Sequence, residues 1–333
     1  MIILFNIGII GAGHMGTAIS EHLARNGFNV KLWVRREKLY QAMQEKRINV
    51  DYFPNYKLNR NILFLNDLKR VVDDSNIVIF ALPSRVMPEV LDKIKQYDKD
   101  FKNIILLSTA KGLLVNPIRR VTECIKEHFP EAKVAALSGP NIAAEVLRGL
   151  PTTTTIAAED DEVLLQLKKI FETRTFKVYL TKDLTGTELC GSLKNVITIG
   201  VGLVNGLELG EDIKGIIVAE GFLEMKELII KMGGQESTLY SPAGLQDLLV
   251  ASFSGASRNY KLGTLLGQGY SLERIIKEFD KITFEGQKTA KIAYDLTKQY
   301  NVKAPLVKMV YSVVSKKISA QKAFEEFWSS YTF

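Results

Sequence analysis

The chain has 333 residues, 46% hydrophobic and 24% charged, a composition typical of a globular protein with two domains and not of a disordered chain. Its formal net charge of +7 is spread along the sequence without a basic block, which argues against nucleic-acid binding. Cys124 and Cys190 cannot build a disulfide framework and favour a reducing cytoplasm, and the scattered histidines have no metal-ligand spacing, so we expect no metal.

The N-terminal stretch predicts a dinucleotide-binding unit. Ile2–Ile10 is apolar but too short to span a membrane, so we expect a buried strand there and no stable membrane insertion. The loop Gly11-x-Gly13-x-x-Gly16 follows, then a helix and a second strand, Asn29–Val34. In this order the glycines permit a tight turn, a close approach of the backbone to a pyrophosphate, and close helix–strand packing.

The end of the second strand carries information about the cofactor. NAD sites place an acid there to hold the ribose 2′-hydroxyl, whereas an arginine accommodates the 2′-phosphate of NADP. Here the strand ends in Arg35 and Arg36, with Glu37 only afterwards. NADP(H) is therefore favoured and NAD(H) stays possible; two solvated surface arginines are the alternative interpretation.

Further strands alternate with other elements up to residue 181 and predict an α/β domain with a Rossmann-type, mostly parallel sheet. Ligands of such sheets bind at the carboxyl ends of the strands. Lys111 and the turn Ser138–Asn141 follow two of these strands, although Lys111 alone could be an ordinary surface lysine. The predicted strands are Ile62–Leu65, Asn76–Leu82, Asn103–Ser108, Lys133–Leu137, Thr152–Ala158 and Phe176–Leu180.

After Thr181 helical periods replace strand patterns, so we expect a dinucleotide-binding domain over 1–184 and an all-helical, substrate-binding and catalytic domain over 185–333. The apolar faces of its helices would allow a homodimer, but a packed core explains them equally well. The helices are expected at 184–207, 212–232, 242–253, 257–267, 271–279, 285–300, 304–315 and 319–328.

One helix, Thr185–Leu207, is apolar almost all round and should be buried, yet it contains Glu188, Lys194 and Asn195. A buried lysine loses its proton more easily than a free one, which makes Lys194 a candidate for proton transfer. The alternatives are a lysine that extends to the surface, or one paired with Glu188 for structural reasons.

Two helix starts add candidate binding groups. Asp247 brings a carboxylate to the beginning of one helix. Ser257, Arg258 and Asn259 combine a hydroxyl, a guanidinium and an amide at another, a grouping that suits a phosphate. Ser257 could instead be a plain N-cap.

Taken together, these motifs resemble the bacterial-type NAD(P)-dependent glycerol-3-phosphate dehydrogenases over nearly the whole chain. The motifs that carry the resemblance are Gly11-x-Gly13-x-x-Gly16, Asn49-x-x-Tyr52-Phe53-Pro54, Pro83-Ser84, Ser108-x-x-Lys111-Gly112, Leu137-Ser138-Gly139-Pro140-Asn141-x-Ala143, Glu188-x-x-Gly191-x-x-Lys194-Asn195, Ala243-Gly244-Leu245-x-Asp247, Ser257-Arg258-Asn259 and Glu285-Gly286.

The resemblance implies interconversion of dihydroxyacetone phosphate and sn-glycerol 3-phosphate with NAD(P)H, which supplies phospholipid synthesis. It makes Lys194 the proton acceptor, with Lys111 and Asp247 beside it. The residues that it places against the substrate are Lys111, Gly139, Asn141, Lys194, Asn195, Asp247, Ser257, Arg258 and Asn259. The resemblance and the end of the second strand together give the residues expected against the cofactor: Gly11, Gly13, His14, Met15, Gly16, Arg35, Arg36, Tyr52, Pro83, Lys111, Ala143, Arg258 and Glu285.

Departures from the family pattern, among them Glu220, Gln246 and Ala251, leave open a related dehydrogenase of another phosphorylated or carboxylated substrate. A third interpretation is a nicotinamide redox sensor without turnover, against which the presence of Lys111, Lys194 and Asp247 together argues.

Overall fold

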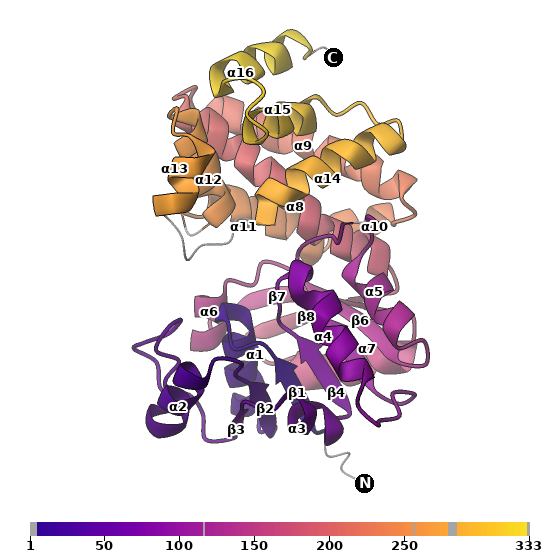
Figure 1. The fold of residues 1–333 in the computed structure, drawn as a ribbon. Helices are drawn as coiled ribbons and strands as arrows, with labels where there is room; N and C mark the ends of the chain where they lie inside the picture. Colours follow the sequence, from indigo (N-terminus) through magenta and orange to yellow (C-terminus); the bar gives the residue numbers. More distant parts are fainter. Residues whose placement is uncertain (1–4, 116, 256, 279–284, 332–333) are drawn as a thin grey trace. The chain divides into compact units, whose positions relative to one another are not determined.

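The computed structural model describes residues 5–115, 117–255, 257–278 and 285–331, which form two compact units (Figure 1). The first unit contains the described residues of 1–110 and 119–184, and the second those of 111–118 and 185–333. The expected boundary between residues 184 and 185 assigns the short segment Lys111–Ile118 to the first domain. In the structure this segment packs with the second unit. The reason is apolar burial, since Leu113 is part of the helical core and Ile118 packs against it.

The first unit is built on an eight-stranded sheet in the order β3-β2-β1-β4-β5-β6-β7-β8. All neighbouring strands are parallel except β6 and β7, which are antiparallel, so the expected mostly parallel sheet is confirmed. β3 and β7 have the predicted bounds, and residues 2–4 of the first predicted strand lie outside the described residues. The strands are β1 Ile7–Ile10, β2 Val30–Trp33, β3 Ile62–Leu65, β4 Ile77–Phe80, β5 Ile105–Ser108, β6 Lys133–Ser138, β7 Thr152–Ala158 and β8 Phe176–Thr181.

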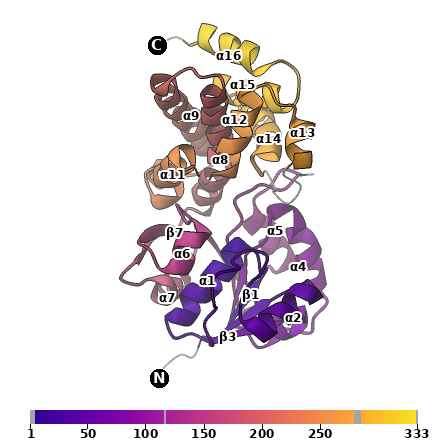
Figure 2. The same cartoon turned by 90° about the vertical axis from the view of Figure 1, so that its left-hand side faces the viewer.

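Helices cover both faces of this sheet. α1, α6 and α7 pack together on one face, and α3, α4 and α5 on the other (Figures 1 and 2). The helices are α1 His14–Arg25, α2 Glu37–Lys46, α3 Leu68–Asp73, α4 Met87–Lys95, α5 Val121–His128, α6 Ala143–Arg148 and α7 Asp161–Phe171, with a 3₁₀ turn at Ser84–Val86.

The second unit is helical, as predicted, and its core surrounds α8 (Leu184–Gly206), in which every residue from Gly186 to Val204 is buried. None of the helices in the described part of the chain is long and apolar enough to cross a membrane. The other helices are α9 Glu211–Lys231, α10 Glu236–Leu239, α11 Asp247–Phe253, α12 Arg258–Gly267, α13 Leu272–Glu278, α14 Glu285–Gln299, α15 Pro305–Val314 and α16 Ala320–Ser329.

The helix predicted over 242–253 is wrong in its first half. Pro242–Gln246 forms a π-helical turn in which Gly244 leaves helical geometry, with φ −93° and ψ −105°. A Cβ on Gly244 would lie 2.0 Å from the carbonyl oxygen of Leu239, so only glycine fits this close backbone approach. The consequence is that α11 begins at Asp247, the predicted functional carboxylate.

Four glycines let α8 and α12 touch backbone to backbone. A Cβ on Gly202 would lie 2.2 Å from the carbonyl oxygen of Tyr260, and one on Gly263 would lie 2.1 Å from that of Ile199. The same pattern recurs one turn later, at Gly206 and Gly267. This crossing fixes α12, which begins at Arg258, against the helix that carries Lys194.

Candidate active site

The glycine loop after β1 has the geometry that a dinucleotide pyrophosphate requires. Gly11 has φ +114°, and a Cβ on it would lie 2.6 Å from the carbonyl oxygen of Ala81, so only glycine makes this turn. A Cβ on Gly16 would lie 1.8 Å from the carbonyl oxygen of Gly11. By contrast, a Cβ on Gly13 would have no atom within 4 Å, so the backbone of this helix N-cap is open to a ligand.

The sheet order identifies the same place. β1 lies between β2 and β4, so the connections leave its two sides in opposite directions, and ligands of such sheets bind at this switch point. Pro83, predicted to contact the cofactor, is exposed just after β4. The tight turn at Gly11, the open backbone at Gly13 and the strand order together fit a dinucleotide-binding site in the first unit.

The segment 47–61 between α2 and β3 is tied to the glycine loop. Asn49, fully buried, donates from Nδ2 to the carbonyl oxygen of Ala12 at 3.0 Å and to Oγ1 of Thr17 at 2.8 Å. Arg47, which has φ +55°, donates to the carbonyl oxygens of Asn59 at 2.5 Å and Ile62 at 2.8 Å. The segment is thereby held at both ends.

Two residues predicted to bind the cofactor, Arg35 and Arg36, follow the end of β2. Arg35 and Arg36 are both exposed, and the guanidinium of Arg36 lies 5.7 Å from the ring centroid of Tyr52. The exposed His14 lies edge-on to the same tyrosine, with 4.7 Å between centroids. Met15 is partly buried against the core of the first unit, so the structure gives its side chain a packing role.

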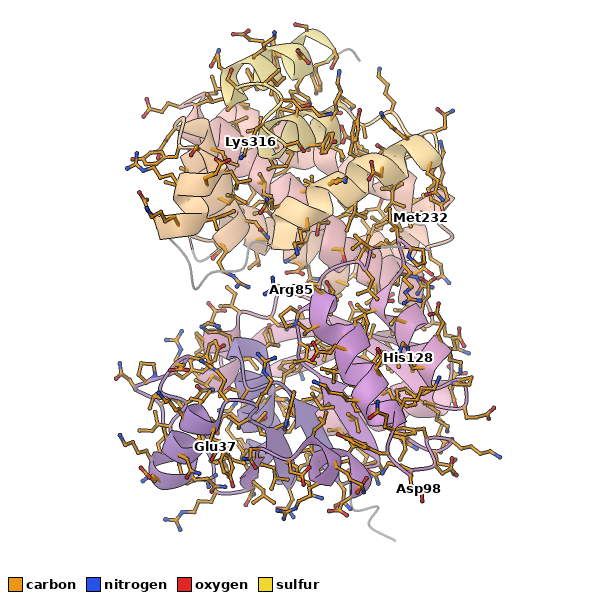
Figure 3. The ribbon with its side chains drawn as sticks, viewed as in Figure 1. Glu37, Arg85, Asp98, His128, Met232 and Lys316 are labelled. Carbon is orange, nitrogen blue, oxygen red and sulfur yellow. The ribbon has the colours of Figure 1, made fainter. Side chains whose placement is uncertain are left out.

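Glu37, labelled in Figure 3, is the acid nearest the two arginines in sequence and begins α2. One of its carboxylate oxygens accepts from Nε2 of Gln41 and the other from Nδ2 of Asn66, each at 2.6 Å. These two hydrogen bonds hold the Glu37 carboxylate between α2 and the residue that follows β3. A contact of Arg35 and Arg36 with the 2′ position of the cofactor stays a prediction.

In the second unit one carboxylate joins the two predicted catalytic lysines. Nζ of Lys194 lies 2.5 Å from one oxygen of Asp247, and Nζ of Lys111 lies 2.8 Å from the other. Lys194 is only 6% exposed, so the alternative of a lysine that extends to the surface is wrong. The ion-pair partner of Lys194 is Asp247, which the family resemblance places beside it, and the alternative of a pair with Glu188 is wrong. Lys111 belongs to the segment that leaves the first unit after β5.

The surroundings of Lys194 make its proton easier to remove. Burial is the largest cause and lowers the pKa of Lys194 from 10.5 to about 8. Asp247 acts in the opposite direction, and the charge of Lys111 lowers the pKa further. A lysine with a pKa near 8 exchanges its proton near neutral pH, as a general acid or base requires.

Asn195, the residue after Lys194, links three segments of the second unit. Its Nδ2 donates to the carbonyl oxygen of Lys111 at 3.3 Å, and its Oδ1 accepts from Nδ2 of Asn259 at 2.9 Å. Asn259 Oδ1 in turn accepts from the backbone N–H of Gly286 at 3.3 Å. The chain of amides therefore aligns the lysine cluster with the start of α12. The neighbouring Glu285 begins α14, and its side chain lies outside the described residues.

The beginning of α12 holds the predicted phosphate residues. Ser257 is the N-cap, and its hydroxyl accepts from the backbone N–H of Tyr260 at 3.3 Å, whereas its contact with a phosphate stays a prediction. Arg258 is exposed at the first helical position. A helix N-terminus with an exposed guanidinium is a favourable place for an anion.

The turn after β6 contains the remaining predicted residues, Gly139, Asn141 and Ala143. The Asn141 amide donates to the carbonyl oxygen of Thr153 at 2.9 Å, and its Oδ1 accepts from Oγ1 of Thr154 at 2.9 Å. A Cβ on Gly139 would lie 2.9 Å from Cα of Thr154. These contacts give Asn141 and Gly139 a structural role in joining β6 to β7. Ala143 begins α6. Their contact with substrate or cofactor stays a prediction.

A second group of reactive residue types is structural. Nδ1 of His128 (Figure 3) lies 3.8 Å from the sulfur of Cys124, and its Nε2 lies 3.1 Å from Asp92. Cys124 is fully buried, and burial raises the pKa of its thiol, which opposes formation of a nucleophilic thiolate. Among the described residues no three His, Cys, Asp or Glu side chains are grouped to hold a metal ion.

The sequence also matches known families. Residues 6–164 match the N-terminal family described as NAD-dependent glycerol-3-phosphate dehydrogenase N-terminus, and residues 183–325 match its C-terminal counterpart. The chain belongs to this family. It is an oxidoreductase family, and its two parts correspond to the α/β unit and the helical unit.

Individual relatives agree over nearly the whole chain. A glycerol-3-phosphate dehydrogenase [NAD(P)+] from Fusobacterium nucleatum is 37% identical over 97% of this chain and 96% of its own length. One from Carboxydothermus hydrogenoformans is also 37% identical, over 92% of this chain and 91% of its own. The crystal structure of the enzyme from Coxiella burnetii is similar with a TM-score of 0.91 at 29% identity, covering 97% of this chain and 98% of that one.

Local sequence pattern gives Asn49 no functional role. Asn49 stands in one of the family motifs, and its buried link to the glycine loop appears only when residues 37 positions apart are brought together. The sequence signal at this place is the polar, aromatic composition of 47–61.

Proposed function

We propose that this chain interconverts dihydroxyacetone phosphate and sn-glycerol 3-phosphate with a nicotinamide cofactor. The observation that carries the proposal is the cluster in which Asp247 holds Lys194 and Lys111 in the second unit, linked through Asn195 and Asn259 to a helix start with an exposed arginine. Two cations and a phosphate-binding helix suit a small phosphorylated ketone. The glycine loop of the first unit suits the dinucleotide.

The nicotinamide, when bound, supplies or accepts the hydride. The residues of the second unit manage the proton and the charge. In the reduction, Nζ of Lys194 donates a proton to the oxygen that becomes the hydroxyl, and in the oxidation it takes that proton back. The ammonium of Lys111 stabilises negative charge that develops on the same oxygen. Asp247 keeps both lysines at fixed positions through ion pairs of 2.5 and 2.8 Å.

A steady-state assay with NADPH and dihydroxyacetone phosphate tests the proposal directly. We expect oxidation of NADPH that depends on the ketone and forms sn-glycerol 3-phosphate. Tight NADPH binding without any turnover would contradict the enzyme assignment and favour a redox sensor. Turnover with a larger phosphorylated or carboxylated ketone, and none with dihydroxyacetone phosphate, would contradict the substrate.

Replacing Arg258 with alanine should raise KM for dihydroxyacetone phosphate about 10- to 100-fold, since a charge-assisted hydrogen bond contributes about 1.5–3 kcal/mol. The unphosphorylated ketone dihydroxyacetone should lose far less, and the ratio of the two effects is the measurement. Arg274→Ala is the control, because this arginine is 61% exposed on α13 and pairs with Glu278. Equal losses for both ketones would show that Arg258 has a structural role.

We expect the chain to bind NADPH more tightly than NADH, with Arg35 and Arg36 facing the 2′-phosphate. Arg35→Ala should weaken NADPH binding by up to about 3 kcal/mol and leave NADH binding nearly unchanged. Quenching of Trp33, the last residue of β2, offers a measurement without a second substrate. A variant that loses affinity for both nucleotides equally would contradict a contact with the 2′-phosphate.

Three wider assignments rest on the family and on composition. The product supplies glycerophospholipid synthesis, and two buried free cysteines suit a reducing cytoplasm. A homodimer is also proposed, since apolar side chains such as Leu223 and Phe253 are more than half exposed on the second unit. Sedimentation of the purified chain as a monomer would contradict it.

A further inference from the structure

A carboxylate lies against one of the two arginines at the end of β2. Nη1 of Arg36 is 2.7 Å from Oδ2 of Asp51, and the side chains of this pair are 51% and 42% exposed. The next residue, Tyr52, presents its ring to the same guanidinium at 5.7 Å. Two consecutive residues of the segment 47–61 therefore hold Arg36 from two directions.

The position of Asp51 is fixed by its neighbours in the sequence. Asn49, two positions before Asp51, is fully buried and bonded to Ala12 in the glycine loop. The ring of Phe53, two positions after Asp51, lies edge-on to His14 at 5.5 Å between centroids. Because both neighbours are fixed to the start of α1, the carboxylate of Asp51 has a defined position beside the predicted cofactor site.

The charges at this site are more balanced than the sequence indicates. Arg35 and Arg36 bring two positive charges and Glu37 one negative charge, which hydrogen bonds from the neutral amides of Gln41 and Asn66 hold in place. Asp51 adds a second negative charge. It lies 15 positions after Arg36, so the sequence at the end of β2 does not indicate it. It neutralises part of the attraction that a 2′-phosphate would feel, and it has no equivalent effect on NADH, which is uncharged at that position.

We propose that Asp51 is a specificity-determining residue, which acts through Arg36 to reduce the discrimination between NADPH and NADH. The inference rests on the proposed function, because it concerns the cofactor of that reaction. Asp51 competes with the 2′-phosphate for the guanidinium of Arg36 and leaves Arg35 as the stronger attraction. The chain thereby retains useful affinity for both nucleotides.

The test is the pair of dissociation constants for NADPH and NADH, measured calorimetrically on the full chain without a second substrate. Asp51→Asn should raise the ratio Kd(NADH)/Kd(NADPH) about two- to fivefold, the size expected for charges exposed to water. The change should lie in NADPH binding and should shrink at 0.5 M KCl, where exposed charges are screened.

Asp74→Asn is the matched control. Asp74 pairs with Lys31 at the same distance of 2.7 Å, is 70% exposed, and its loss changes the charge of the same unit by the same amount. Lys31 lies near the beginning of β2, whereas Arg36 follows its end. We expect this variant to leave the ratio unchanged.

The double variant that combines Asp51→Asn with Arg36→Ala tests whether Asp51 acts on NADPH binding through Arg36. If Asp51 acts through Arg36, the second substitution should abolish the gain in selectivity. A ratio that does not rise in Asp51→Asn, or that rises equally without Arg36, would overturn the inference. An unmodified chain that binds neither nucleotide would instead overturn the proposed function, and the inference with it.

Discussion

Replacing Lys194 with methionine should lower turnover about 10²- to 10⁴-fold, the usual loss when a general acid or base is removed. The amine is the group that is lost, because methionine keeps a similar length and an apolar side chain in a helix that is buried from Gly186 to Val204. Asp247 retains Lys111 as its partner, so the carboxylate is not left without a cation. The fold should therefore persist.

Binding and turnover must be measured together in this variant. NADPH affinity should be unchanged, because the glycine loop and the two arginines belong to the first unit. Lys308→Met is the control, since this lysine is 62% exposed on α15 and its contact with Glu326 is long, at 3.9 Å. Near-normal turnover in Lys194→Met would assign the proton to Lys111 or to water, and a chain that fails to fold would show a structural ion pair.

Much of the fold follows from local pattern. β3 and β7 have the predicted bounds because each is a short apolar or β-branched run with clear turn residues on both sides. The antiparallel direction of β7 was not predicted, since a strand's sequence does not encode the direction of its neighbour. The π-helical turn at Gly244 was missed for a similar reason, because it depends on contact with the Leu239 backbone.

The site was predictable where a residue type is unusual for its place. A lysine in an apolar helix and a glycine loop after a strand are both local signals, and they led to Lys194 and Gly13. The family resemblance places Lys111 and Asp247 beside Lys194, but local pattern alone cannot do so, because Asp247 lies 53 positions from Lys194 and 136 positions from Lys111. Burial, the cause that the apolar helix predicts for Lys194, is also the largest cause of its lowered pKa.

Asp247→Asn should have the largest effect on stability. Asp247 is 2% exposed and forms ion pairs with two lysines, so its loss leaves a buried ammonium without a counter-charge. Breaking such a buried pair typically costs about 3–5 kcal/mol in the free energy of unfolding. Lys111, whose side chain is 20% exposed, still has access to water, so most of this cost belongs to Lys194.

The pH dependence of the free energy of unfolding tests whether Asp247 acts on the charge of Lys194. Asp247 raises the pKa of Lys194, so the substitution should lower it below its value of about 8. An unfolded lysine has a pKa of about 10.4, hence between the two values the unfolded chain binds more protons and stability rises with pH. In the unmodified chain this rise begins near pH 8, and in Asp247→Asn it should begin lower. Between pH 6 and 8 the deficit should therefore shrink, by at most about 1.4 kcal/mol per pH unit.

Denaturant unfolding at pH 6, 7, 8 and 9 measures the deficit, and the pH profile of kcat/KM gives an independent readout. Ketone reduction requires protonated Lys194, so its loss of rate with rising pH, expected near pH 8 in the unmodified chain, should move to lower pH in Asp247→Asn. Adding Lys111→Met removes the like charge and should restore part of both effects, because Lys111 lowers the pKa of Lys194. A deficit that stays constant from pH 6 to 9 would show that Asp247 does not act on the charge of Lys194.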